Sequence, residues 1–317
     1  MEGKEPKRIL VLGSAVIDVI IDIERLPKAG EDIPGIQKGM IVGGCAFNVS
    51  KILDGLHMPH DLCVPVGQGM YANRIRQALR QGAHDVLIED TRCDNGYSLS
   101  LVEKDGERTF ISIDGIETKW QDAWLANLDA TRYDYVYASG YGFQDGNTSG
   151  DVIMRFLRRK KPDCRLILDP GPRLLGKQFE EELLQMGTIL EMNQAEAKAM
   201  GQSEDVRQAA RNLQKRTGQP VIVTMGKAGT LCCTSDEETI VPAVPVKAID
   251  TIGAGDSHTA GFLAALARGK TLLEACAEAN RVAARCGMLV AVNFSYDRIG
   301  WGYSLAYFCC SNPFFDV

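Results

Sequence analysis

The sequence predicts an α/β fold, in which helices flank a mostly parallel central sheet and a small antiparallel sheet is attached as a lid. Short apolar runs alternate along the chain with stretches of helical periodicity, the pattern of a parallel sheet covered on both faces. Two further stretches alternate apolar and polar residues, which is typical of strands with one exposed face. The chain has 317 residues and is 45% hydrophobic, enough to bury a sizeable core.

The apolar runs are predicted to be buried strands, and the stretches between them the covering helices, in one domain over residues 1–286. The predicted strands cover residues 8–13, 61–66, 133–139, 165–169, 188–192 and 220–224. The predicted helices cover residues 46–56, 72–81, 149–159, 204–216 and 257–268.

The two alternating stretches, residues 19–42 and 94–116, are predicted to form the lid. In the second stretch an Asp105-Gly106 turn separates two alternating runs and predicts a hairpin. Paired with the first stretch, this hairpin would make a half-exposed sheet that closes over a substrate. The same sheet offers a surface through which two copies of the chain could form a homodimer.

Charge and cysteine content restrict the partners. There are 35 Lys and Arg residues against 41 Asp and Glu residues, a formal charge of -6, so a small molecule is favoured over nucleic acid or an anionic membrane. No apolar run reaches the roughly 18 residues of a membrane span. Ten cysteines are scattered without a C-x-x-C pair, and the four histidines do not cluster near them. This disfavours zinc chemistry and suits a reducing, cytoplasmic compartment.

The strongest chemical motif is DTIGAGDS, residues 250–257, which a helical pattern follows at once. Gly253 and Gly255 let backbone amides turn inward, and the helix start adds unpaired N–H groups, so the segment predicts an anion-binding site. Asp256 would lie beside a bound phosphate, where its carboxylate could accept a proton from an attacking hydroxyl. The alternative is that Asp256 only stabilises the start of the helix.

Two further motifs begin where strands end. Asn193-Gln-Ala-Glu196 carries side-chain oxygens that could hold Mg²⁺ directly or through water, but the same spacing forms a capping box. Thr224-Met-Gly226-Lys-Ala-Gly229 closes a predicted strand with a glycine turn that a base or a phosphate could approach. Because glycine turns between strands are frequent, a purely structural turn is the alternative with the stronger prior.

A third group of residues lies near the lid. Gly43 and Gly44 join the lid to a helix and permit close approach to the backbone, and Asn48, one turn later, could hydrogen-bond a polyol. Asp18 follows the first strand, at the edge where parallel sheets bind ligands, although it could simply cap the strand end.

Other nucleotide-binding templates fail. Gly269-Lys270-Thr271 is similar to the end of a Walker A loop but follows a helix instead of preceding one. Gly67-Gln-Gly69 lacks the third glycine of a dinucleotide fingerprint, which disfavours a dehydrogenase.

In order and spacing, GGCAFN, KDGERTF, NQAE, TMGKAG and DTIGAGDS together resemble the ribokinase (PfkB) family of carbohydrate and nucleoside kinases, over residues 8 to about 286. The resemblance implies a ribokinase-like fold and transfer of the γ-phosphoryl group of ATP, with Mg²⁺, to an alcohol of a sugar, sugar acid or nucleoside. It also implies that Asp256 is the catalytic base, with the amides of Gly253, Ala254 and Gly255 as the anion hole.

The remaining implied site residues fall into three sets. By the resemblance, the sugar hydroxyls would be contacted by Asp18, Gly43, Gly44 and Asn48, the nucleotide by Asn193, Thr224, Gly226, Gly229 and Asn280, and Mg²⁺, through water, by Glu196.

Residues 287–317 depart from the resemblance. They hold three charged side chains but eight of the 22 aromatic residues, where the family has a glycine-containing loop beside a monovalent cation and then a polar helix. True divergence and an altered reading frame both stay open for this atypical segment. We predict that a cation site at Asp250 responds weakly to potassium. The changed segment favours a kinase-like sugar- or nucleotide-binding regulator, whereas Asp256 with its two glycines favours an active kinase.

Overall fold

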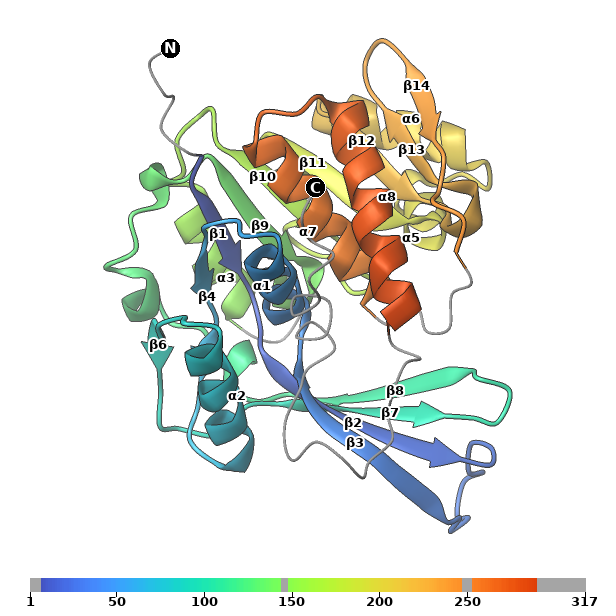
Figure 1. Ribbon diagram of the computed structural model, residues 1–317. Coiled ribbons are helices and arrows are strands. Elements are labelled where there is room, and N and C mark those ends of the chain that lie inside the picture. The colour runs from blue at the N-terminus through green and yellow to red at the C-terminus, as the bar shows by residue number, and fades with distance from the viewer. Residues whose placement is uncertain (1–6, 144–147, 247–252, 290–317) are drawn as a thin grey trace.

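Residues 7–143, 148–246 and 253–289 are described in the computed structural model, and eight of their strands form the main sheet (Figure 1). The strand order is β14-β13-β12-β11-β10-β9-β1-β4, and all neighbours from β12 to β4 run parallel. At one edge of the sheet, β13 pairs antiparallel with β12, and β14 pairs antiparallel with β13. The strands are β1 (Ile9–Leu12), β4 (Asp61–Cys63), β9 (Tyr135–Ser139), β10 (Arg165–Asp169), β11 (Thr188–Asn193), β12 (Val221–Thr224), β13 (Thr230–Cys233) and β14 (Glu238–Val241).

Both faces of this sheet are buried, because successive side chains of a strand point to opposite sides. In β1, Ile9 and Val11 enter one hydrophobic cluster, whereas Leu10 and Leu12 enter the other. The first cluster lies under α1 (Cys45–Gly55), α2 (Met70–Gln81), α7 (Ala254–Ala267) and α8 (Leu272–Leu289). The second lies under α3 (Ser149–Leu157), α4 (Glu180–Leu184), α5 (Gln194–Gly201) and α6 (Val206–Thr217).

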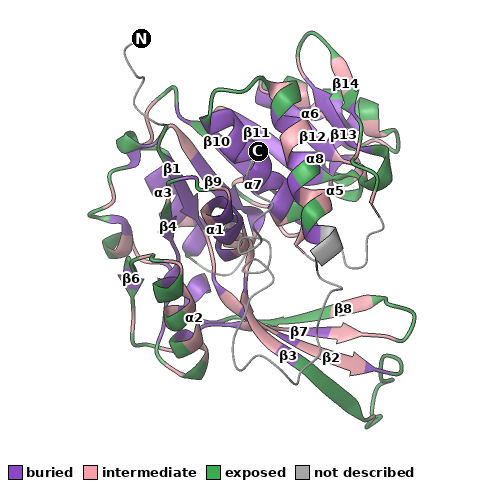
Figure 2. Cartoon of the chain, in the orientation of Figure 1, coloured by how far each residue is buried: buried purple, intermediate pink, exposed green. Residues whose placement is uncertain are grey.

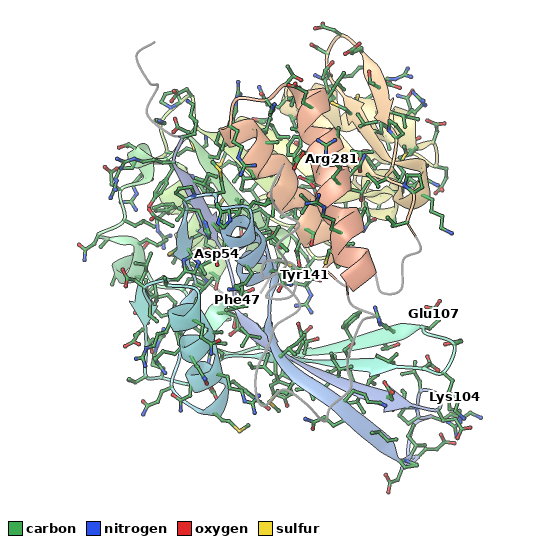
Figure 3. All side chains as sticks on the ribbon, in the orientation of Figure 1. Phe47, Asp54, Lys104, Glu107, Tyr141 and Arg281 are labelled. Carbon is green, nitrogen blue, oxygen red and sulfur yellow. The ribbon has the colours of Figure 1, made fainter. Side chains whose placement is uncertain are left out.

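The lid is a separate four-stranded sheet that projects from the main body (Figure 1). It contains β2 (Val16–Ile23), β3 (Gly35–Gly43), β7 (Tyr97–Val102) and β8 (Arg108–Ile113), in the order β3-β2-β7-β8. Both outer pairs are antiparallel, but β2 and β7 run parallel because the chain passes through the main body between them. Figure 2 shows the lid as mainly half-buried or exposed, and Figure 3 places Lys104 and Glu107 at its tip.

Shorter elements complete the described chain. They are β5 (Pro65–Val66), β6 (Ile88–Glu89) and the 3-10 helices η1 (Ile116–Thr118), η2 (Asp122–Leu125), η3 (Ala130–Arg132), η4 (Gly140–Phe143) and η5 (Gly226–Ala228). Among the described helices, none is both long and apolar enough to cross a membrane.

The predicted fold class is confirmed, with differences at the level of single elements. The apolar run 61–66 forms two strands in two different sheets, and the first lid strand already begins at Val16. Helix α8 continues to Leu289, so the first three residues of the segment 287–317 are helical. Residues 290–317 lie outside the described part of the chain.

Candidate active site

Polar side chains gather at the carboxyl edge of the main sheet. Asp169 ends β10, Asn193 ends β11 and Thr224 ends β12. These three strands are parallel neighbours, so their ends meet at one edge, where open parallel sheets bind ligands.

The start of α7 is arranged as an anion-binding site. Gly253 precedes the helix with φ +72°, and its carbonyl accepts the first intrahelical bond, from Ser257 N at 2.9 Å. The amides of Ala254, Gly255 and Asp256 therefore have no carbonyl partner within the helix. Beyond its own helix and chain neighbours, no atom of the described residues lies within 4 Å of a Cβ placed on Gly255, whose φ is not left-handed. Among these residues, neither packing nor backbone conformation requires glycine at position 255, and the open space fits a ligand that approaches these amides.

Asp256 is held by two side chains from the first turn of α1. Asn48 Nδ2 donates to Asp256 Oδ2 at 2.8 Å, and the Cys45 thiol also hydrogen-bonds to Asp256. Burial raises the pKa of the Cys45 thiol well above its usual value, so the thiol is the donor. Burial also raises the pKa of Asp256 to about 6; the two hydrogen bonds oppose this shift, and the charge of Glu191 adds to it.

Asp18 faces the same region from the lid. Burial, and then the charge of Asp256, raise the pKa of Asp18 to about 6. A Cβ on Gly43 would lie 2.0 Å from Asp18 Oδ2, so the carboxylate occupies the space that a side chain at position 43 would need. Gly44 has φ +96° and would bring a Cβ to 2.8 Å from Ser14 O. The structure therefore brings together Asp18, the paired glycines and Asp256.

Asp169 is a site residue that the sequence analysis missed. Its carboxylate, the Cys45 sulfur and the Asp256 carboxylate have ligand atoms that all lie within 4.8 Å of one another. Burial raises the pKa of Asp169 to about 8, and the nearby charges of Asp256 and Glu196 add to the shift. A buried group of repelling carboxylates fits a divalent cation with oxygen ligands such as Mg²⁺. The position of Asp169 at the end of a parallel strand could have identified it. The same reasoning placed Asp18 at the end of the first strand, but Asp18 lies within the lid strand β2.

Asn193 and Glu196 form the capping box that their spacing allowed. Glu196 N donates to Asn193 Oδ1, and Asn193 N donates to Glu196 Oε2, both at 3.0 Å. Glu196 Oε1 lies outside this pair of bonds, so the box leaves one oxygen for a metal-bound water. The roles of Asn193 toward the nucleotide and of Glu196 toward Mg²⁺ stay predictions.

Local backbone structure explains most of the residue types at the expected nucleotide site. Gly226 has φ +57° and Gly229 has φ +97°. A Cβ on Gly229 would lie only 2.1 Å from Val241 O, so the turn itself requires glycine at this position. Thr224 Oγ1 donates to Met192 O at 3.3 Å. That this turn also contacts a nucleotide stays a prediction.

A buried polar chain, also missed by the sequence analysis, runs beneath the start of α7. Glu191 Oε1 lies 2.5 Å from His258 Nδ1, and His258 Nε2 lies 2.9 Å from Thr230 Oγ1. Thr230 Oγ1 donates to Asn280 Oδ1 at 2.8 Å, and Asn280 Nδ2 donates to Val241 O at 3.2 Å. These hydrogen bonds connect His258 on α7, two residues after Asp256, to β11, β13 and α8. A direct contact of Asn280 with the nucleotide stays a prediction.

Tyr141 and Arg173 add a cationic group on the same side of the sheet. The Arg173 guanidinium carbon lies 4.9 Å from the centre of the Tyr141 ring, which Figure 3 shows near the middle of the molecule. Burial raises the pKa of Tyr141 to about 12, with smaller effects from Cys45, Arg173 and Asp169. Stacking therefore holds Arg173 against Tyr141, a ring close enough to the acidic group for the charge of Asp169 to affect its pKa. The predicted cation ligand Asp250 lies outside the described residues.

Comparison with known proteins identifies the family to which the chain is similar. The sequence profile of the pfkB family of carbohydrate kinases matches residues 6–286. A protein of Escherichia coli K12 named uncharacterized sugar kinase YegV is 35% identical over 281 residues, which cover 87% of each chain. A ribokinase of Arabidopsis thaliana is 27% identical over 292 residues, 88% of this chain and 75% of that one.

Solved structures show the same fold at lower identity. A ribokinase from Thermotoga maritima superposes with a TM-score of 0.76 at 22% identity, covering 89% of this chain and 93% of that chain. The Arabidopsis thaliana ribokinase complexed with ribose and ATP superposes with a TM-score of 0.73 at 23% identity, with the same coverage. The predicted ribokinase-like architecture is thus confirmed.

Proposed function

This chain belongs to the pfkB family of carbohydrate kinases, and we propose that it transfers the γ-phosphoryl group of ATP to a hydroxyl of a small sugar, sugar acid or nucleoside. In this proposal Asp256 is the general base of the transfer. Membership makes the chain an ATP-dependent carbohydrate kinase, as the sequence motifs predicted. The observation that carries the proposed role is the position of Asp256, bonded to Asn48 within the first turn of an anion-binding helix start.

The substrate would bind between the lid and α1. Asp18 offers a hydrogen-bond acceptor to the hydroxyl groups, and Asn48 offers a donor. The Asp18 carboxylate has room for this role because residue 43 is glycine. Asp256 would accept the proton of the hydroxyl that attacks the γ-phosphorus, while the amides of Ala254 and Gly255 would stabilise negative charge on the transferred group.

Phosphoryl transfer also needs charge neutralisation and the exclusion of water. Asp169 and Glu196 would hold Mg²⁺, which neutralises the phosphate oxygens of ATP when bound. Arg173, fixed by Tyr141, would add positive charge on the same side. Closure of the lid would exclude water, so that the hydroxyl of the substrate is the nucleophile that reaches phosphorus.

The proposal is tested by incubating the purified protein with ATP, Mg²⁺ and panels of sugars, sugar acids and nucleosides. Mass spectrometry is expected to show one added phosphoryl group on at least one compound. Binding of a sugar across the panel without any phosphorylated product would instead support the alternative, a kinase-like regulator with little turnover.

The rate is expected to fall as the pH drops through about 6. Asp256 accepts a proton only when ionised, and its pKa of about 6 means that the ionised fraction is lost below that pH. An unperturbed aspartate would keep its charge down to about pH 4. The check is the acidic limb of kcat/KM against pH, with saturating MgATP at every pH. A limb lying near pH 4 would contradict the raised pKa.

Sugar binding is expected to slow hydrogen exchange in the lid. The strands β2, β3, β7 and β8 form a sheet of their own, so they can move relative to the main sheet. Mass spectrometry of peptides from residues 16–43 and 97–113 should show protection with saturating substrate, whereas α6 on the opposite face serves as an unchanged control. Equal exchange in the free and saturated protein would count against closure.

A further inference from the structure

Three metal-ligating side chains converge away from the active site, at the C-terminal half of α1. Asp54 lies on α1 (Figure 3), His60 precedes β4 and His84 follows α2. One ligand atom of each lies within 4.8 Å of the other two. His84 Nε2 is 2.9 Å from Asp54 Oδ1, and His60 Nε2 is 4.0 Å from the same oxygen. These short separations are close to those between ligands that share one small metal ion.

His60 is already in the form that binds metal. Its Nδ1 lies 2.9 Å from Met58 O, and because a carbonyl only accepts, Nδ1 carries the hydrogen. The His60 side chain is 1% exposed, and with Nδ1 donating to Met58 O, Nε2 is the nitrogen that faces Ser50 and Asp54. A histidine whose second nitrogen donates to a backbone carbonyl is the usual arrangement of a metal ligand. Ser50 Oγ lies 2.7 Å from His60 Nε2 and 3.3 Å from His84 Nε2, so it adds a hydroxyl oxygen beside both rings.

The charges around the group select the class of metal. Lys51 Nζ lies 3.6 Å from Asp54 Oδ2, the oxygen that His84 Nε2 also approaches, at 3.1 Å, so the ammonium group offsets the carboxylate charge and leaves Oδ1 as the ligand oxygen. Hard cations such as Mg²⁺ and Ca²⁺ depend on several carboxylate oxygens, which this group lacks. Imidazole nitrogens suit Zn²⁺ and neighbouring transition metals.

We propose that Asp54, His60 and His84 form a binding site for Zn²⁺ or a similar transition-metal ion. Asp54 Oδ1 and the two Nε2 atoms are the ligands, and the Ser50 hydroxyl or a water takes the fourth position. Metal entry replaces the hydrogen between His84 Nε2 and Asp54. In a neutral His84 ring the hydrogen lost from Nε2 is matched by one taken up at Nδ1, and in a protonated ring it leaves as a proton to solvent. The site ties the end of α1 to the ends of α2 and of the loop before β4. It is independent of the proposed kinase reaction.

This site differs from the zinc chemistry that the sequence disfavoured. That expectation rested on histidines being far from cysteines, whereas the ligands here include no cysteine. The fold, rather than a local motif, brings His60 and His84 together, with ring centres 4.9 Å apart.

The test is Zn²⁺ titration of the chelator-treated full chain in competition with a chromogenic chelator, with excess Mg²⁺ and a Cys45→Ser background to suppress binding at the active site. One tight equivalent is expected, weakened at least about 100-fold by His84→Gln and by His60→Gln. His57→Asn is the matched control, because His57 is exposed, lies close in sequence and has a left-handed φ of 51° that Asn tolerates.

Two further measurements keep the result interpretable. Zn²⁺ should raise the melting temperature of the parent chain and of His57→Asn but not that of His84→Gln. Because the His84 side chain is only half-buried, His84→Gln should itself be folded. Co²⁺ substituted for Zn²⁺ should give a visible tetrahedral spectrum without a sulfur charge-transfer band. Absence of a tight equivalent, or its retention in both His60→Gln and His84→Gln, would overturn the proposal.

Discussion

Asp256→Asn is expected to lower kcat by about 10²- to 10⁴-fold, the range that loss of a general base typically gives. Asn keeps the shape of the side chain and can still bond to Asn48, but it cannot take the proton of the attacking hydroxyl. The KM values for sugar and ATP should change far less than kcat. Steady-state kinetics with the phosphorylated product measured directly would show this.

A second aspartate at a helix start provides the control. Asp205 precedes α6 and accepts a hydrogen bond from Gln208 N, remote from the site on the other face of the sheet. Asp205→Asn removes the same charge from a helix N-terminus and should leave kcat unchanged. If Asp256→Asn were as active and as stable as Asp205→Asn, Asp256 would only stabilise its helix, and the general-base role would be wrong.

Gly43→Ala is expected to reduce kcat/KM for the sugar by about 10²-fold. The new Cβ would lie 2.0 Å from Asp18 Oδ2, and atoms cannot approach so closely, so the carboxylate must turn away from its place. Displacement of a positioning group by about 1 Å can cost this much in rate. ATP, which we propose to bind at the turn after β12 rather than at the lid, should bind nearly as well as before, which isothermal titration with a non-hydrolysable ATP analogue would measure.

Gly39→Ala on the same strand is the matched control. A Cβ on Gly39 would meet Ile20 Cδ1 at 3.8 Å, an ordinary contact, so this variant changes the same residue type in β3 without disturbing Asp18. Both variants should be checked for an unchanged melting temperature. A similar kcat/KM for Gly43→Ala and Gly39→Ala would show that Asp18 does not depend on position 43.

The local part of this fold was predictable from sequence. Strands buried on both faces read as continuous apolar runs, so β1, β9 and β10 could be placed almost to the residue. Strands β13 and β14 were missed because they pair antiparallel with β12 and with each other, without the α-helix that separates the predicted parallel strands. The parallel pairing of β2 with β7 depends on the path of the chain between them, which no alternating pattern contains.

The site was predictable where one short segment contains both turn and chemistry. Gly253, Gly255 and Asp256 stand together in sequence, and Asn48 follows the paired glycines by one turn. Asp169 and His258 were missed because their significance arises from neighbours on other strands, such as Glu191 for His258. The same reason hides the proposed metal site, whose ligands belong to separate elements.

The bond between Asn48 and Asp256 has a consequence for the synthesis of the chain. The two residues are 208 positions apart, and Asp256 lies on α7, after every strand of the main sheet. A ribosome therefore synthesises the strands of the main sheet and of the lid before it synthesises Asp256 and the start of α7. With Asp256 in its proposed role, a nascent chain can fold much of the main sheet and the lid, but it cannot transfer phosphate until α7 has packed against α1. The order of elements along the chain thus makes the proposed reaction depend on one of the last helices to be synthesised.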